Sequence, residues 1–260
     1  MYKNWRSFCG IFALSSSLLL AVGCGTSGNT FVRAVNASPG LTAYAYYIQV
    51  GPAQVAFGLP YGTEGVTQPG QFKTDTSGQY CPVGAGIQTI EVFFTRNIGL
   101  KKENIGLTLV KKDLVKNGHY TIVSVGTFPH VHLLTLYDQN IRATSGHFRL
   151  RVINAAASSG GVDVYLTAPG ASAAGSTPIL TNFQFGQVTQ TYFELVPGKY
   201  ELQITAAGNP SNVLVEEPFT PVVLRTYSAF VIDPAPGSSQ GIIWLEEAAF
   251  ERPLRFKAKV

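Results

Sequence analysis

The chain has 260 residues, of which 45% are hydrophobic and 13% charged, and its net charge is +4. This hydrophobic content is enough to bury a core, which excludes a chain that is disordered throughout. The charge is small and scattered, so the composition does not indicate nucleic-acid binding, and we expect no nucleic-acid partner.

The first 23 residues have the pattern of a secretory signal. Lys3 and Arg6 precede an uncharged apolar run from residue 8 to residue 22, which is shorter than a typical membrane span. The run ends in Ala-Val-Gly-Cys24, which resembles a bacterial lipobox, although Ala21 stands where the usual motif has Leu. The alternative is an ordinary signal peptide followed by a coincidental cysteine.

The lipobox predicts that Cys24 is lipidated and anchors the mature protein to a membrane. Residues 24–29 are polar and rich in Gly, Ser, Thr and Asn, as expected of a flexible tether. Gly25 after the cysteine favours the outer membrane, on its periplasmic or surface face, by resemblance to other lipoproteins. Cys81 is then the one cysteine left in the body, so no disulfide framework is expected.

The body repeats itself once, which predicts two modules at residues 30–140 and 147–250. Residues 141–146 are the linker, and residues 251–260 form a basic tail or an added strand. The repeat is carried by paired segments: Arg33 to Ala37 with Arg151 to Ala155, His119 to Thr121 with Thr226 to Ser228, and His132 to Tyr137 with Ile242 to Glu247.

The hydrophobic period inside each module is two rather than 3.6. Between residues 199 and 205, for example, Tyr200, Leu202 and Ile204 alternate with polar residues. Short alternating strands between Gly, Pro and Asn clusters predict an all-β fold of two tandem antiparallel Ig-like β-sandwiches. Tyr200 and Tyr120 each follow a turn at the spacing of a tyrosine corner, and we expect the Tyr200 ring to be buried with its hydroxyl bonded near Leu195.

These motifs resemble the domain-of-unknown-function family 4397, whose modules occur in bacterial secreted and surface lipoproteins. The resemblance rests on Arg-x-x-Asn-Ala, the Val-Asp-Val-Tyr that contains Asp163, and Gly-x-Tyr at strand starts, and it covers both modules. Asn36 and Asn154 stand where the family often has His or Asn. Tyr44 replaces the family's Asp in module one. The resemblance implies a β-sandwich and an envelope location, and it implies no activity.

Asn36, Asn154 and Asp163 are the polar residues most open to a functional role. Asn154 is in phase with apolar residues of its strand and is expected to point inward at the strand's end. The simple interpretation is a hydrogen-bonded strut where the chain turns. The alternative is contact with a ligand at the loop end.

No catalytic signature is present, and we expect neither an enzyme nor a cofactor. His130 and His132 would lie on one strand face, about 6.5 Å apart, but no third ligand is adjacent, so no metal site is expected. The glutamate pairs 216–217 and 246–247 are expected on solvated faces. Cys81 has no nearby His in the sequence. A lysine cluster, residues 101–116, either protects an edge strand or contacts anionic groups.

The sequence therefore predicts a cell-envelope lipoprotein with a structural, adhesive or binding role. Its partners would be the membrane, through Cys24, and an envelope protein or polysaccharide. The alternatives are an envelope carbohydrate-processing enzyme of unrecognised type and a cupredoxin-like metal-binding protein.

Overall fold

The computed structural model describes residues 28–39, 45–57, 59, 61–65, 80–98, 101–234 and 241–247. Several predictions fall outside these residues: the signal segment, the lipidation site Cys24, most of the tether, Tyr44 and the basic tail. Within the described part, no helix is long and apolar enough to cross a membrane.

The described residues form strands throughout, with one short 3-10 helix, η2 (Ala173–Gly175). The first half contains β1 (Asn29–Ala37), β2 (Ala45–Val50), β3 (Ala53–Phe57), β4 (Thr63–Gly65), β5 (Cys81–Gly84), β6 (Gly86–Ile98), β7 (Lys101–Leu114), β8 (His119–Val125) and β9 (His132–Asp138). The second half contains β10 (Phe148–Asn154), β11 (Val162–Thr167), β12 (Leu180–Phe183), β13 (Phe193–Leu195), β14 (Tyr200–Ala206), β15 (Asn209–Phe219), β16 (Thr226–Ile232) and β17 (Gly241–Glu247).

The strands form four sheets, two in each half. In the first half β4-β1-β8-β9 make one sheet, with β5 also paired to β1, and β3-β2-β6-β7 make the other. The second half repeats this arrangement as β13-β10-β16-β17 and β12-β11-β14-β15. The prediction of an all-β chain with two similar sandwich-like halves is confirmed. Each half also contains one parallel pair, β1 with β8 and β10 with β16.

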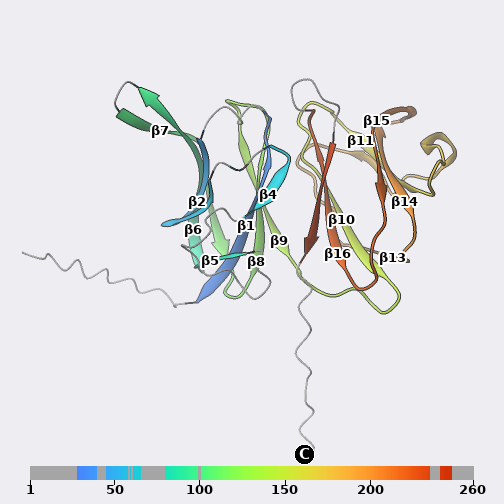
Figure 1. Ribbon diagram of the computed structural model, residues 1–260, viewed down its shortest axis with the longest axis horizontal. Helices are drawn as coiled ribbons and strands as arrows, with labels where there is room; N and C mark the ends of the chain where they lie inside the picture. The colour runs from blue at the N-terminus through green and yellow to red at the C-terminus, as the bar shows by residue number, and fades with distance from the viewer. Residues whose placement is uncertain are drawn as a thin grey trace, which may run out of the picture.

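The four sheets stack as four layers (Figure 1). One apolar cluster fills each sandwich, around Ile48 and Ile90 in the first half and around Leu202 and Ile204 in the second. A third cluster joins the halves: it packs residues of β1, β8 and β9 against residues of β10, β16 and β17. We call this contact between the two inner sheets the seam.

The seam covers the second face of the inner strands. β14 belongs to an outer sheet, and its apolar residues alternate with polar ones. All seven residues of β10 are buried, because its two faces pack against different clusters. A strand covered on both faces has no solvent side on which polar alternation would be favoured. The polar residues of the inner strands are therefore buried polar groups that need partners inside the protein.

The tyrosine corners occur at two different places in the fold. The Tyr120 hydroxyl accepts a hydrogen bond from the Val115 amide at 2.9 Å, and the Tyr227 hydroxyl accepts one from the Val222 amide at 3.1 Å. Tyr200 donates to the Val196 carbonyl at 2.5 Å, one residue beyond the expected position. Its ring is half-buried rather than buried as predicted, because it packs at the margin of the core.

Candidate functional site: the polar end of the seam

Two arginines lie at equivalent positions on the inner strands. Arg33 of β1 and Arg151 of β10 belong to the repeated Arg-x-x-Asn-Ala motif. Residues two and four places further along each strand pack in the apolar seam cluster. Because side chains two apart lie on one face of a strand, both arginines face the seam. They are 1% and 3% exposed, so each guanidinium needs an internal counter-charge.

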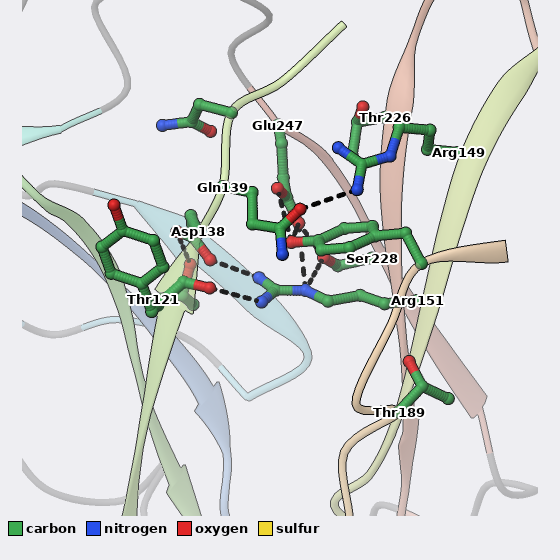
Figure 2. A network of polar contacts seen from close by, with 12 residues as sticks. Thr121, Asp138, Gln139, Arg149, Arg151, Thr189, Thr226, Ser228 and Glu247 are labelled. Carbon is green, nitrogen blue, oxygen red and sulfur yellow. Dashed lines mark hydrogen bonds and ion pairs between the residues drawn. The ribbon is translucent and has the colours of Figure 1, made fainter. Parts of the chain in front are cut away.

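Arg151 binds carboxylates from both halves (Figure 2). Its Nη2 donates to Oδ1 of Asp138, the last residue of β9, and its Nε lies 3.0 Å from Oε1 of Glu247, the last residue of β17. The same Nε donates to the Ser228 hydroxyl at 2.6 Å, and Ser228 in turn donates to Glu247 at 2.6 Å. Tyr192 donates its hydroxyl to both Glu247 oxygens, at 2.9 Å each. One guanidinium thus ties β9 to β10 and β17.

The first half contributes the same set of groups around Asp138. Asp138 Oδ2 accepts hydrogen bonds from the Thr121 hydroxyl at 2.5 Å and from the Tyr80 hydroxyl at 2.9 Å. Arg33 Nε donates to Thr121 at 2.9 Å and lies 3.7 Å from Asp138 Oδ2. The Arg33 guanidinium also lies over the Tyr80 ring, 4.8 Å from its centre. Each half therefore supplies one arginine, one hydroxyl residue, one tyrosine and one acid.

The contacts across the seam are also paired. Arg33 Nη1 donates to the carbonyl of Glu246 at 3.2 Å, and Arg151 Nη1 donates to the carbonyl of Tyr137 at 3.1 Å. Glu246 and Tyr137 are the residues just before the two buried acids. The two halves thus meet with approximate two-fold symmetry, and each arginine reaches the same backbone position of the opposite half.

Burial dominates the electrostatics of this cluster. Asp138 is 2% exposed and Glu247 is fully buried. Burial raises the pKa of Glu247, and Arg151 offsets part of that rise. Burial alone would lower the pKa of Arg151, but Asp138 and Glu247 outweigh it and hold the pKa above its ordinary value. Burial also raises the pKa values of the Tyr80 and Tyr192 hydroxyls, which stay protonated and act as donors.

A second arginine of β10, Arg149, packs beside the cluster. Arg149 stacks on the Tyr192 ring at 4.3 Å and donates to the Gln139 side chain at 2.7 Å and to the Ile141 carbonyl at 3.2 Å. Gln139 and Ile141 lie in the segment that joins the halves. These bonds fix the joining segment against β10, as Figure 2 shows for Gln139.

This geometry suits structure better than catalysis. The two acids converge as a glycosidase pair would, but both are buried and bonded to arginine, serine, threonine or tyrosine. The two arginines and two acids form a balanced set of charges, which fixes one register between the inner sheets.

Asn36 and Asn154 lie at the far ends of β1 and β10, and their side chains bond to the backbone. Asn36 Nδ2 donates to the Leu59 carbonyl at 2.9 Å, and its Oδ1 accepts from the Ser38 amide at 3.1 Å. Asn154 repeats both bonds, with the Phe183 carbonyl and the Ala156 amide. Both side chains are buried, and their hydrogen bonds brace the turns that follow the strands.

Asp163 on β11 makes a similar brace in the second half. Its two oxygens accept hydrogen bonds from the amides of Asn182 at 2.7 Å and Gly208 at 2.8 Å. The carboxylate thus ties β11 to β12 and to the turn between β14 and β15. It is 5% exposed and lies apart from the polar end of the seam.

The histidine pair is arranged differently from the prediction. His130 lies in the turn before β9, and His132 begins that strand, so the two do not share a strand face. Both are exposed. Among the described residues, no group of three or more His, Cys, Asp and Glu side chains is placed to hold a metal ion.

The prediction that both glutamate pairs lie on solvated faces is wrong for Glu247. Glu247 is buried because β17 is an inner strand and its last residue faces the seam. Glu217 is also engaged: it accepts from the Ile242 amide and the Trp244 indole, at 3.1 Å each. Glu216 lies beside Glu201, whose hydrogen bond raises the pKa of Glu216.

Two further sequence features lie away from the seam cluster. Cys81 is a free buried thiol on β5, and burial raises its pKa. Lys111, Lys112 and Lys116 are exposed on the edge strand β7 and the turn after it. The side chains of Lys101 and Lys102 lie outside the described residues.

Comparison with known proteins gives a family. Residues 30–165 match the family described as a domain of unknown function, DUF4397. The chain belongs to the DUF4397 family. No curated protein matches the chain. Among solved structures, one from work described as alpha-glucan binding by a streptococcal virulence factor shares 12% identity, covers 78% of this chain and 93% of its own, and has a TM-score of 0.24. A likeness this slight carries no argument about ligand or mechanism.

Sequence reasoning missed the acids of this DUF4397 chain. The repeat alignment paired Tyr137 with Glu247, whereas the strand pairing places Asp138 opposite His119 and Glu247 opposite Thr226. A shift of one residue therefore hid two equivalent acids. The available signal was the pair of arginines inside otherwise apolar strands, since a buried arginine requires an acid nearby.

Proposed function

We propose that the protein is a non-catalytic binding lipoprotein of the bacterial cell envelope, anchored at Cys24, whose partner is an envelope polysaccharide. The observation that carries the binding role is the outer face of the β3-β2-β6-β7 sheet. The locked seam supports a body that presents this face rigidly.

The outer face carries aromatic and polar side chains together. Tyr47 of β2 and Phe93 of β6 are direct cross-strand partners, and their rings stack with centres 4.9 Å apart and planes 5° apart. Gln49 and Glu91 are the next pair on the same face. Leu109, opposite Glu91 on β7, is 56% exposed.

This combination suits a sugar chain. Tyr and Phe offer apolar ring surface to the carbon-bound hydrogens of a sugar, and the neighbouring amide and carboxylate can bond to its hydroxyls. Stacking holds the two rings together before any ligand arrives, which lowers the entropy lost on binding. Exposed Lys111, two residues after Leu109 on β7, extends the same face with positive charge.

A binding assay with two matched variants tests this role. Mature protein carrying Cys24→Ser is incubated with polysaccharide prepared from bacterial envelopes, and the bound fraction is measured. Phe93→Ala should reduce binding strongly, whereas Val213→Ala, which trims an exposed valine of the other half, should not. Equal binding by both variants would remove the aromatic pair from the proposal, provided that both unfold like the parent.

The enzyme alternative has its own measurement. The buried state of Asp138 and Glu247 argues against a glycosidase, because both acids are committed to internal bonds. Incubation with the same polysaccharide should release no new reducing ends. Release by the pure protein would overturn the non-catalytic part of the proposal.

The anchor and the fold type belong to the same proposal. Mass spectrometry of the mature N-terminus should find lipid on Cys24, and Cys24→Ser should move the protein from the membrane fraction to the soluble fraction. We also infer an Ig-like topology for each half, supported by the repeated sandwich and its corner tyrosines.

A further inference from the structure

Exposed apolar side chains gather at one end of the molecule. In the described part of the chain, eight large hydrophobic residues are exposed. Six of them lie at the end of the molecule where β1, β8, β10, β14 and β16 begin and where the antiparallel neighbours of these strands end. They are Ile87, Val115, Tyr137, Val196, Val222 and Val223. We call this the anchor end, because β1 begins there after the tether.

In the first half this end is a turn built against the start of β1. Val115 is 60% exposed and opens the turn that leads to β8. The Asn117 amide donates to the Asn29 carbonyl at 2.8 Å, and the Lys116 side chain lies against Gly28. Ile87 is 76% exposed and lies beside this turn, because the preceding residue, Gly86, pairs with Leu114 at the end of β7.

The second half has the equivalent turn, with more apolar surface. Val222 and Val223 are 55% and 47% exposed. Leu224 has a φ of 66°, a left-handed conformation that a bulky residue seldom adopts. Its amide is held by the His147 carbonyl at 2.7 Å. The turn therefore keeps a strained backbone while it presents two valines to the outside.

The two turns face the same way. Val115 and Val222 occupy one position of the repeat, since each amide bonds to the tyrosine five residues later. The end of β9 lies beside the start of β8, because Asp138 is the partner of His119. Arg149, the second residue of β10, donates to the side chain of Gln139, which directly follows β9, at 2.7 Å. The starts of the inner strands of both halves thus lie at one end (Figure 1).

We propose that the anchor end rests on the lipid bilayer that holds the protein. This inference depends on the proposed lipidation of Cys24. From Cys24 to Gly28 the chain can span at most about 14 Å, so the anchor end cannot move far from the headgroups. Tyrosine side chains favour the interfacial region, and valine and isoleucine side chains favour the acyl boundary just below it. Exposed Lys116 and Lys199 suit anionic headgroups.

Tryptophan quenching in vesicles tests the proposal. The reporters are Val222→Trp and, in the equivalent turn, Val115→Trp; the control is Val213→Trp, an exposed valine near the opposite end of the second half. Each lipidated protein is reconstituted into phosphatidylethanolamine–phosphatidylglycerol vesicles with brominated acyl chains. The chain's own Trp244, packed on Phe219, gives a constant background.

We expect the emission added at positions 222 and 115 to be largely lost and the emission added at position 213 to remain. Unquenched reporters on lipidated, vesicle-bound protein would overturn the inference and leave the anchor intact. Mass spectrometry tests the anchor separately, and an unmodified Cys24 would overturn both. If Cys24→Ser protein in plain buffer shows a reporter blue shift that grows with concentration, the surface binds a second copy, and the inference is wrong.

Discussion

Arg151 illustrates what a buried charge requires of its neighbours. Its guanidinium bonds to Asp138, to Ser228 and to the Tyr137 carbonyl, and it pairs with Glu247. Such a group stabilises the fold only while its partners remain, because a lone ion in the interior loses its hydration without compensation. Because each nitrogen of the Arg151 guanidinium has a hydrogen-bond partner, the cation is stable between two apolar sheets.

Replacing Arg151 by Met should therefore be costly. The variant leaves Asp138 and Glu247 buried without their shared cation, and we expect the free energy of unfolding to fall by about 3–5 kcal/mol. The matched control is Arg225→Met, which breaks the exposed pair between Arg225 and Glu246. That pair is worth about 0–1 kcal/mol. Denaturant unfolding measures both, and equal losses would contradict the role of the seam.

The raised pKa of Glu247 predicts a pH dependence. Folded protein holds this proton more tightly than unfolded protein, so folding takes up protons between the usual value of 4.5 and the higher folded pKa. The contribution to stability is present below 4.5 and is lost as pH rises through the folded pKa. Glu247→Gln should remove this part of the slope. Denaturant unfolding at a series of pH values gives the free energy of unfolding for variant and parent. Parallel curves for the two proteins would show that Glu247 does not cause the pH dependence.

At the scale of the turns, one sequence spacing produces two different structures. Tyr120 and Tyr200 both follow Leu-Val and a Gly turn, but the structural equivalent of Tyr120 is Tyr227. Tyr120 and Tyr227 accept hydrogen bonds from turn amides, whereas Tyr200 donates to a carbonyl. The Tyr120 bond is partly buried and the Tyr200 bond is exposed. The spacing between the turn and the tyrosine therefore does not show whether the tyrosine lies on an inner strand, as Tyr120 does, or on an outer strand, as Tyr200 does.

Tyr120→Phe should destabilise the protein more than Tyr200→Phe. Removing the Tyr120 hydroxyl leaves the Val115 amide without its acceptor, a loss of about 1 kcal/mol. The Val196 carbonyl can bond to water once Tyr200 loses its hydroxyl, so that change should stay within about 0.5 kcal/mol. Thermal unfolding of the two variants compares them, and the reverse order would refute the assignment.

The sequence predicts some elements better than others for a physical reason. Alternation in Tyr200, Leu202 and Ile204 predicts a β-strand, and β14 confirms it, although the intervening Gln203 and Thr205 are buried as well. Alternation does not reveal the seam, because β10 also alternates apolar residues with Arg149 and Arg151 while all seven of its residues are buried. Asp138 and Glu247 stand at strand ends where the repeat slips by one residue, so their equivalence emerges only from the strand pairing.

At the scale of the whole molecule, the seam couples the unfolding of the two halves. Each half has its own apolar cluster, which favours folding as a unit. Both halves also bury residues such as Val123 and Phe230 against each other, and they share Arg151 and Asp138. The joining segment is held to β10 and β16 by Arg149 and Thr226. The halves should thus unfold as one cooperative body in the intact chain.

Cutting the chain in the joining segment tests this coupling. The isolated residues 147–260 keep their own cluster, so they should still unfold cooperatively, but at a lower denaturant midpoint than the intact protein. They expose the apolar seam to water, while Arg151 loses Asp138 but keeps Glu247 and becomes hydrated. Each large apolar side chain left uncovered costs about 1.5–3 kcal/mol, and a few of them amount to a large part of the roughly 5–15 kcal/mol that holds a domain. Adding residues 28–140 should restore the midpoint, and Arg151→Met in the fragment should weaken that rescue. An isolated second half as stable as the intact chain would show that the seam contributes nothing, and a fragment with no cooperative transition would show that its own core is insufficient.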